Sequence, residues 1–177
     1  MNLEQLFITL NYSYDVSDTL SVGVAPVLAL QRFAATGLQP FQNPAFTTNP
    51  LAVTNNGHEW SKGAGLGLIW EASPQVTIGA SYRTKINMDP FSKYSGLFAN
   101  GGDFDIPATT KLGLTYSPCP ELSFTAEWER IFHSDVAAIS NADPLPSTGS
   151  GLPLGSTSGA GFGWKDMDVI RVGLSIE

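Results

Sequence analysis

Apolar and polar residues alternate one by one over long stretches of this chain. The stretch VTIGASYR at 76–83 is typical, because its apolar residues would share one face of a strand and its small or polar residues the other. Ile86 and Met88 continue the same apolar face. Alternation of this kind predicts seven antiparallel strands, over residues 5–15, 19–33, 62–72, 75–89, 108–117, 121–136 and 166–177.

Two kinds of connection join these predicted strands. Tight turns follow the first, third and fifth strands, whereas long connections follow the second, fourth and sixth, over residues 33–61, 90–107 and 137–165. All the long connections are therefore expected at one end of the sheet, which is typical of a transmembrane β-barrel with short periplasmic turns and long extracellular loops. The strand lengths agree with this class, since a tilted membrane strand needs about 9–11 residues.

An aromatic residue precedes each tight turn on the apolar face. Tyr14, Trp70 and Tyr116 occupy equivalent positions in three matching segments. Aromatic residues are common in the strands of any sheet. Three equivalent aromatic residues before three short turns favour the other interpretation, a ring of side chains at a membrane–water interface.

Composition narrows the possible function classes. The formal net charge is −7 and no basic stripe is present, which argues against a nucleic-acid partner. Cys119 is the only cysteine, so no internal disulfide can form. His58 and His133 have no companions at metal-ligand or catalytic-triad spacing. We therefore expect no metal, no cofactor and no catalytic residue, and the chain is not predicted to be an enzyme.

Two segments resemble a known family. Residues 104–136, FDIPATTKLGLTYSPCPELSFTAEWERIFHSDV, and residues 161–177, GFGWKDMDVIRVGLSIE, are similar to outer-membrane long-chain fatty-acid and hydrocarbon transporters of the FadL/TodX type. The resemblance implies a 14-stranded antiparallel transmembrane β-barrel, monomeric when complete, in the outer membrane of a Gram-negative bacterium. Because the predicted strands match the fourth to tenth of such a barrel, residues 1–177 are expected to be a middle fragment of a single barrel domain, without hatch or signal peptide.

The resemblance also implies a function. Members of the family take up hydrophobic compounds passively and capture them in a groove between the third and fourth extracellular loops, which match residues 33–61 and 90–107. Apolar side chains in these loops could bind fatty acids or hydrocarbons, because each buried methylene contributes about 0.8 kcal/mol. The alternative role for each of these loop residues is packing of the loops on each other. Outer-membrane lipid or detergent is expected to surround the barrel. The candidates are Phe33, Leu38, Phe41, Phe46, Leu51, Phe91, Tyr94, Leu97 and Phe98.

Several charged residues fall on the polar face of the strands, which would line the lumen of a barrel. They are Arg83, Lys85, Lys111, Glu127, Glu129 and Arg171. Lys111 and Glu127 stand at equal distances from the same turn, so we expect them to lie nearly opposite each other and to pair. Guidance of a ligand carboxylate is the alternative role for the lumenal cations. Arg130 falls on the apolar face, which predicts a position near the extracellular interface or a β-bulge.

Other functions fit part of the pattern. A general porin, or a structural or adhesive barrel, would share the membrane strands but use its loops for different contacts. A soluble β-sandwich that binds carbohydrate would instead bury Leu66, Leu68 and Ile78 in a protein core. Binding of hydrophobic ligands and a requirement for lipid or detergent distinguish the transporter from these alternatives.

Overall fold

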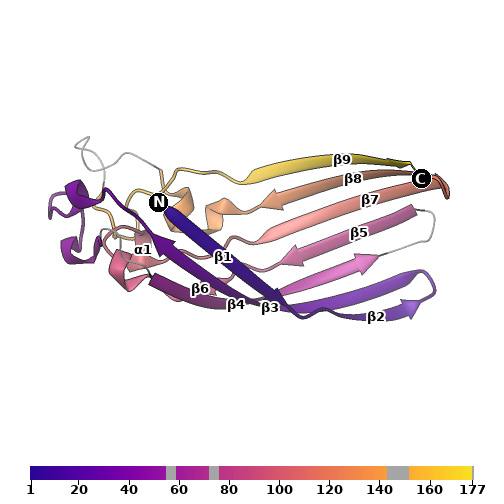
Figure 1. The fold of residues 1–177 in the computed structure, drawn as a ribbon, viewed down its shortest axis with the longest axis horizontal. Helices are drawn as coiled ribbons and strands as arrows, with labels where there is room; N and C mark the ends of the chain where they lie inside the picture. The colour runs from indigo at the N-terminus through magenta and orange to yellow at the C-terminus, as the bar shows by residue number, and fades with distance from the viewer. Residues whose placement is uncertain (55–58, 72–75, 143–151, 177) are drawn as a thin grey trace.

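The strands of this protein form one long antiparallel sheet with the long connections gathered at one end (Figure 1). The computed structural model describes residues 1–54, 59–71, 76–142 and 152–176. The sheet has the order β1-β3-β4-β5-β7-β8-β9, with β2 paired to β3 and β6 paired to β4, so the antiparallel fold predicted from the alternation is confirmed. The strands are β1 (Asn2–Thr9), β2 (Tyr12–Ser17), β3 (Leu20–Ala34), β4 (Glu59–Glu71), β5 (Val76–Arg83), β6 (Asn87–Met88), β7 (Thr109–Cys119), β8 (Leu122–Ile131) and β9 (Met167–Ile176).

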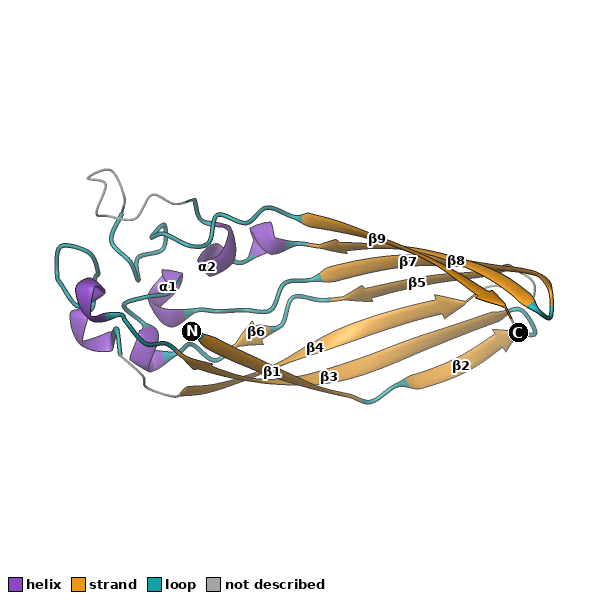
Figure 2. Ribbon diagram, turned by 45° about the horizontal axis from the view of Figure 1, so that its top comes forward, coloured by secondary structure: helices purple, strands orange, loops and turns teal. Residues whose placement is uncertain are grey.

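The described helices are short and lie in the long connections (Figure 2). Within the described segments, none of them has the length and apolar character needed to cross a membrane. They are η1 (Gln39–Phe41), η2 (Pro50–Ala52), η3 (Ser92–Tyr94), α1 (Ala99–Gly102), η4 (His133–Asp135) and α2 (Ala137–Ser140).

The two faces of the sheet differ in chemistry, as the alternation predicts. Residues that pair across strands continue each face: Ile78 lies opposite Leu114, and Leu114 lies opposite Ala126. We call this the outer face, and its large apolar side chains are exposed. These side chains are Leu6, Ile8, Val22, Val24, Leu28, Ile78, Tyr82, Leu112, Leu114, Ile170, Val172, Leu174 and Ile176. The opposite, inner face carries buried residues at the end of β3 nearest the long connections.

The sheet curves around its inner face. The guanidinium of Arg83 lies 5.2 Å from the centre of the Phe7 ring. Phe7 is on β1 and Arg83 on β5, and β3 and β4 separate these strands in the sheet. The contact therefore requires the inner faces of β1 and β5 to turn toward each other, as in the wall of a barrel.

The first predicted strand is interrupted in the structure. β1 and β2 both pair with β3 in one register, since Thr9 lies opposite Val27 and Tyr12 opposite Val24. Between them, the Leu10 N–H donates to the Pro26 carbonyl at 3.1 Å. Pro26 has no N–H to donate in return, so the ladder breaks at this point.

The fourth predicted strand contains a register shift that reverses its faces. Gly67 of β4 lies opposite Arg83, and Gly63 lies opposite Met88. The chain therefore advances four residues along β4 but five residues along the opposite segment. One extra residue in a strand turns every later side chain to the other face. Ile86 and Met88 accordingly point inward and are 0% and 5% exposed, so their predicted place on the outer face was wrong.

The aromatic residues before the tight turns can be located in two of the three cases. Tyr14 and Tyr116 are exposed on the outer face, at 62% and 48%, close to the short turns. The third predicted member, Trp70, has its backbone in β4, but its side chain and residues 72–75, where a turn was predicted, lie outside the described residues. The described pair therefore stands at the same end of the sheet.

Candidate hydrophobic binding site

The three long connections pack together into a single structure. We call their described residues (35–54, 89–108, 132–142 and 152–166) the cap. Backbone hydrogen bonds join each pair of connections: Gly96 N to Ala52 O at 3.0 Å, Thr48 N to Leu154 O at 3.0 Å, and Gly101 N to Gly155 O at 3.0 Å. Because all three pairs are joined, segments far apart in sequence hold one another in place.

Aromatic rings fill the centre of the cap around Phe33. The Phe33 ring centre lies 4.7 Å from that of Tyr94, 4.9 Å from that of Phe98 and 5.8 Å from that of Phe91. Edge-to-face pairs at such distances are favourable beyond the burial of their area. The Tyr94 hydroxyl also accepts a hydrogen bond from the Ala35 N–H at 3.1 Å. Phe33 thus anchors the second connection to the end of β3.

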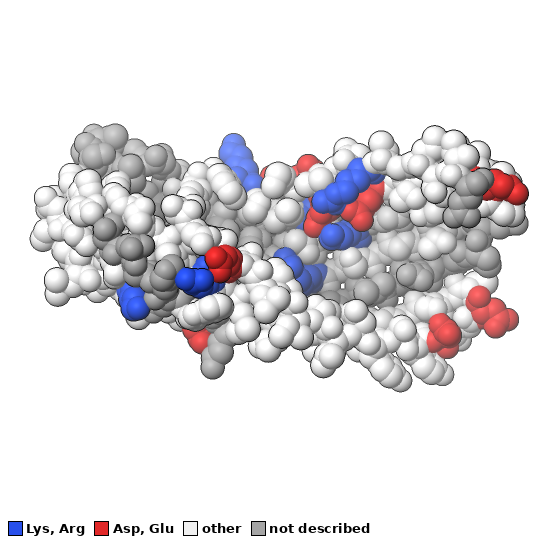
Figure 3. Space-filling model, viewed as in Figure 1, with Lys and Arg blue, Asp and Glu red and all other residues white. Residues whose placement is uncertain are grey.

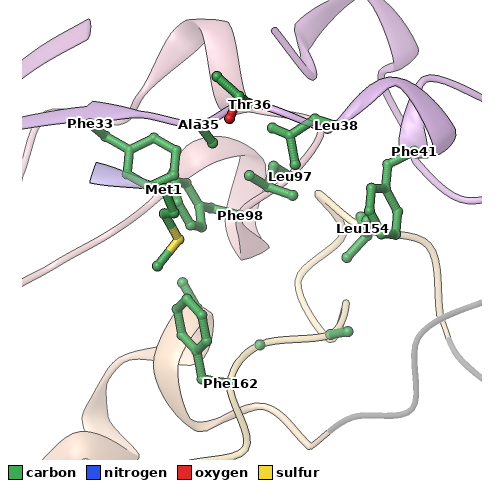
Figure 4. A pocket seen from close by; sticks show the side chains of 13 residues that line it. Met1, Phe33, Ala35, Thr36, Leu38, Phe41, Leu97, Phe98, Leu154 and Phe162 are labelled. Carbon is green, nitrogen blue, oxygen red and sulfur yellow. The ribbon is translucent and has the colours of Figure 1, made fainter. Parts of the chain in front are cut away.

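An apolar cavity of about 220 Å³ lies beside these rings (Figure 4). It is lined by residues from all three connections and from the first residue of the chain. No lining side chain is charged, and Thr36 supplies the one polar side chain among them. The lining residues are Met1, Phe33, Ala35, Thr36, Leu38, Phe41, Leu97, Phe98, Ala138, Leu154, Ala160, Gly161 and Phe162.

The predicted loop residues occupy three kinds of position. Phe33, Leu38, Phe41, Leu97 and Phe98 line the cavity. Phe91 and Tyr94 are fully buried in the aromatic core behind it. Phe46 and Leu51 do not line it, and Leu51 is 95% exposed on η2.

Sequence reasoning missed the contribution of the third connection. Ala138, Leu154, Ala160, Gly161 and Phe162 belong to it and line the cavity. Four of these residues are small or lie in a stretch rich in Gly and Ser, which carries little hydrophobic signal. Phe162, within the GFGW motif, was the one strong signal available in that stretch.

Charged residues form a ladder across the inner face of β7, β8 and β9. The Lys111 Nζ lies 3.4 Å from Glu129 Oε1, and Arg171 Nη1 lies 2.8 Å from Glu129 Oε2. Arg171 also forms an ion pair with Glu127. We call Lys111, Glu127, Glu129 and Arg171 the ionic ladder, and Figure 3 shows blue and red atoms meeting over these strands.

The partner predicted for Lys111 was wrong. Lys111 lies opposite Glu129, whereas Glu127 lies opposite Gly113. The ladder between β7 and β8 continues past Tyr116 to a pair between Cys119 and Leu122, with an irregularity between them. The hairpin therefore turns at residues 120–121, and the ladder register differs from the predicted one by two positions, which keeps the face of each residue but changes its neighbour.

Arg83 and Lys85 lie closer to the cap than the ionic ladder does. The Arg83 Nη2 donates to the Pro107 carbonyl at 3.2 Å. Lys85 stands at the register shift, and its Nζ lies 2.8 Å from the Oδ2 of Asp105. Asp105 is 5% exposed and also accepts a hydrogen bond from the Met88 N–H at 2.8 Å. Burial, together with the charge of the neighbouring Asp105, raises the pKa of Asp103.

Arg130 bridges the start of β9 to β8. Its guanidinium lies 3.4 Å from Asp166 Oδ2 and 3.5 Å from Asp168 Oδ2. Asp166, in the connection before β9, accepts a hydrogen bond from the Ser134 N–H at 3.0 Å, and this bond lowers the pKa of its carboxyl. The cation on the outer face is therefore compensated by two carboxylates beside it.

The described residues offer no grouping of three His, Cys, Asp or Glu side chains that could hold a metal ion. His133 is 8% exposed, and its ring meets that of Trp164 edge to face at 5.6 Å between centres. The cavity can bind an apolar molecule through van der Waals contacts with its apolar lining. The ionic ladder presents charged side chains, which an apolar molecule cannot replace water around.

Solved structures of similar fold are known, although no protein-family model and no curated protein matches the sequence. The Ralstonia pickettii toluene transporter TbuX matches with a TM-score of 0.62 at 17% identity, over 98% of this chain and 52% of that one. The Pseudomonas putida toluene transporter TodX matches with a TM-score of 0.56 at 16% identity, over 98% of this chain and 51% of that one. A Pseudomonas aeruginosa FadL homologue matches with a TM-score of 0.50 at 15% identity, over 75% of this chain and 39% of that one.

These likenesses confirm the fold that the sequence resemblance predicted. The chain spans about half the length of the toluene transporters it matches. Its sheet therefore has the fold of part of the wall of a FadL-type barrel.

Proposed function

We propose that this chain forms part of a passive transporter for hydrophobic compounds in the outer membrane of a Gram-negative bacterium, and that the cap captures the compound. The observation that carries the proposal is the apolar cavity of about 220 Å³ to which all three long connections contribute. The fold shared with two toluene transporters supports the same class of substrate. On this proposal the complete protein is a monomeric barrel, and no covalent chemistry is required.

The outer face supports a membrane location for the sheet. Its exposed side chains include Ile78, Leu114 and Val172, which a soluble protein would cover. Tyr14 and Tyr116 stand near the short turns, and Trp60 is 64% exposed near the cap. Aromatic side chains at both ends of an apolar band are typical of a barrel between two membrane interfaces.

The cavity favours a compact apolar ligand. At roughly 30 Å³ for each water-sized group, its volume corresponds to about seven such groups, close to one aromatic ring with a small substituent. A long-chain fatty acid, the other substrate class implied by the sequence resemblance, would place part of its chain outside the cavity. No lining side chain is charged, so a carboxylate would find no cationic side chain there.

Ligand binding by the full-length protein tests this function. The protein would be purified in detergent, and binding of radiolabelled toluene and oleate would be measured. We expect Phe41→Ser, which removes a ring from the cavity wall, to weaken toluene binding about tenfold, equivalent to about 1.4 kcal/mol.

Leu51→Ser provides the matched control. Leu51 lies in the same connection as Phe41 but is 95% exposed and does not line the cavity. This variant should bind toluene as the unmodified protein does, and heat-modifiable migration on a gel would verify that both variants fold. Equal binding by the two variants would count against capture in the cap, and stronger oleate than toluene binding would favour the fatty-acid substrate.

A further inference from the structure

We infer that the third long connection sets the size of ligand that the cavity accepts, with Ala138 and Ala160 as the residues that determine the limit. This inference rests on the proposed function and deepens it. The walls of the cavity are unequal in chemistry. Phe33, Leu97 and Phe98 form its wall on the β3 side and the second connection. The third connection contributes the small residues Ala138, Ala160 and Gly161 beside Leu154 and Phe162.

The small residues are buried and do not face solvent. Ala138 is 2% exposed and Ala160 is 9% exposed. Ala138 packs in the apolar cluster of Phe33 and Phe98, and both alanines line the cavity, so their small side chains help to leave it open. We call the segment that carries them (137–142 and 157–164) the floor of the cavity.

Backbone contacts make the floor rigid. The Trp164 N–H donates to the Ile139 carbonyl at 3.1 Å, and the Gly163 N–H donates to the Asn141 carbonyl at 3.0 Å. The Asn141 side-chain amide also donates to the Gly159 carbonyl at 2.9 Å. These bonds join the two arms of the third connection along their length.

Gly161 shows how closely the two arms approach. A Cβ at this position would lie 2.8 Å from the Ala138 carbonyl oxygen and 2.9 Å from that of Ala137. Real Cβ contacts are longer than this, and a backbone oxygen held in a short helix cannot move aside easily. The floor therefore has no space to retreat into, and added volume at its surface must enter the cavity.

The consequence is a penalty that depends on ligand size. Ala160→Leu adds three carbon atoms, on the order of 90 Å³ if each occupies a water-sized volume, against a cavity of about 220 Å³. Only about 130 Å³ would then remain, so even a single ring must protrude through the open side of the cavity, and a two-ring molecule must protrude further. A general weakening of the site would instead reduce the affinity for all ligands equally.

A series of neutral aromatic ligands of increasing size tests the inference. Binding of benzene, toluene and naphthalene to the full-length protein would be measured for the unmodified protein and for Ala160→Val and Ala160→Leu. We expect Ala160→Leu to weaken naphthalene binding at least tenfold and benzene binding by a clearly smaller factor, and we expect Ala160→Val to cause a smaller loss than Ala160→Leu for each ligand. Ala45→Leu, at an exposed position of the first connection that does not line the cavity, should change neither affinity.

A second-site change separates size from damage to the fold. Leu154 is 3% exposed and lines the same cavity, so Leu154→Ala removes the three carbon atoms that Ala160→Leu adds. The double variant Ala160→Leu/Leu154→Ala should regain naphthalene binding, which a misfolded cap would not do. An equal loss of affinity for benzene and naphthalene in Ala160→Leu, or no recovery in the double variant, would overturn the size limit but not the proposed function. Failure of the unmodified protein to bind any of these three ligands or oleate would overturn the proposed function itself.

Discussion

The inner face of the sheet has two halves with different chemistry. Toward the cap it is mostly apolar and covered: Val27, Ala29, Ile86, Met88 and Ile106 form a buried cluster there. Further from the cap it is polar, with the ionic ladder across β7 to β9 and with Thr115 and Thr125 in contact through their hydroxyls at 3.3 Å.

The difference shows what sets the composition of each half. The outer face is apolar along the whole sheet. The alternate positions form the inner face, and they can be polar wherever no other part of the chain covers them. Near the cap, the long connections cover the inner face, and its buried side chains are mostly apolar, with the polar ones paired, as Lys85 is with Asp105. A hydrophobic compound finds a compatible surface in the cap half, whereas the ionic ladder offers it no contact that would offset the loss of hydration of the charges.

The largest expected effect comes from the apolar half, in the variant Phe33→Ala. Phe33 is 2% exposed and touches three other rings, so its removal leaves a void that the joined connections cannot fill. We expect a loss of about 3–5 kcal/mol in the free energy of unfolding. Urea unfolding of the full-length protein in lipid vesicles would measure it.

Leu28→Ala on the same strand is the matched control for this variant. Leu28 lies on the outer face and is 45% exposed, and lipid tails can replace the lost contacts because they are as apolar as leucine. A loss in Leu28→Ala as large as that in Phe33→Ala would show that the cap half is no more tightly packed than the outer face.

A smaller effect is expected in the polar half, in the variant Glu129→Gln. Glu129 is 8% exposed and pairs with both Lys111 and Arg171, so neutralising it removes the shared acceptor of two cations. We expect a loss of about 1–3 kcal/mol in the free energy of unfolding. The same urea measurement applies.

Glu127→Gln tests whether the position within the ladder matters. Glu127 pairs with Arg171, which keeps its bond to Glu129 in this variant. The expected loss is about 0–1 kcal/mol, as for an exposed ion pair. Equal losses in Glu127→Gln and Glu129→Gln would contradict a central role for Glu129 in the ionic ladder. The pairing of Glu129 with Lys111 would then add nothing measurable to the stability.

The sequence was sufficient for the sheet but not for its local register. Period-2 alternation located all the strands, because each strand buries or exposes whole faces and the pattern is repeated many times. The shift between Arg83 and Met88 left no trace, since Ile86 and Met88 continue the apolar spacing of β5 across the extra residue. The break at Pro26 could have been predicted, because a proline inside a strand cannot donate to the ladder on that side.

The candidate site was only partly accessible from the sequence. Phe33, Leu97 and Phe98 stand out as apolar residues at the ends of a strand or in a loop, and they line the cavity. Whether such a residue faces the cavity or the core depends on three connections that meet only in the folded chain, as Tyr94 and Leu51 illustrate. Gly161 is required because two backbone segments approach closely there. The pattern of hydrophobic residues in the sequence cannot predict such an approach.

The smallest effect is expected at the border between the two halves, in the variant Asp103→Asn. Burial and the adjacent Asp105 raise the pKa of Asp103 above its unfolded value, so the folded protein binds this proton more tightly than the unfolded chain does. The unmodified protein therefore loses stability as pH rises through the two pKa values, whereas the asparagine variant does not. At pH 7 we expect Asp103→Asn to be more stable by a few tenths of a kcal/mol, about the size of an exposed charge interaction.

The pH dependence of this difference identifies its cause. Below the unfolded pKa of about 3.9, Asp103 is protonated in both states, and the two proteins should then unfold at the same urea concentration. Measurements at pH 7 and pH 3 give the comparison directly. A difference in stability that persists at pH 3 would assign the gain to a changed hydrogen bond of residue 103. Repulsion between the Asp103 and Asp105 carboxylates would then not contribute, because the ion pair with Lys85 would already balance the charge of Asp105.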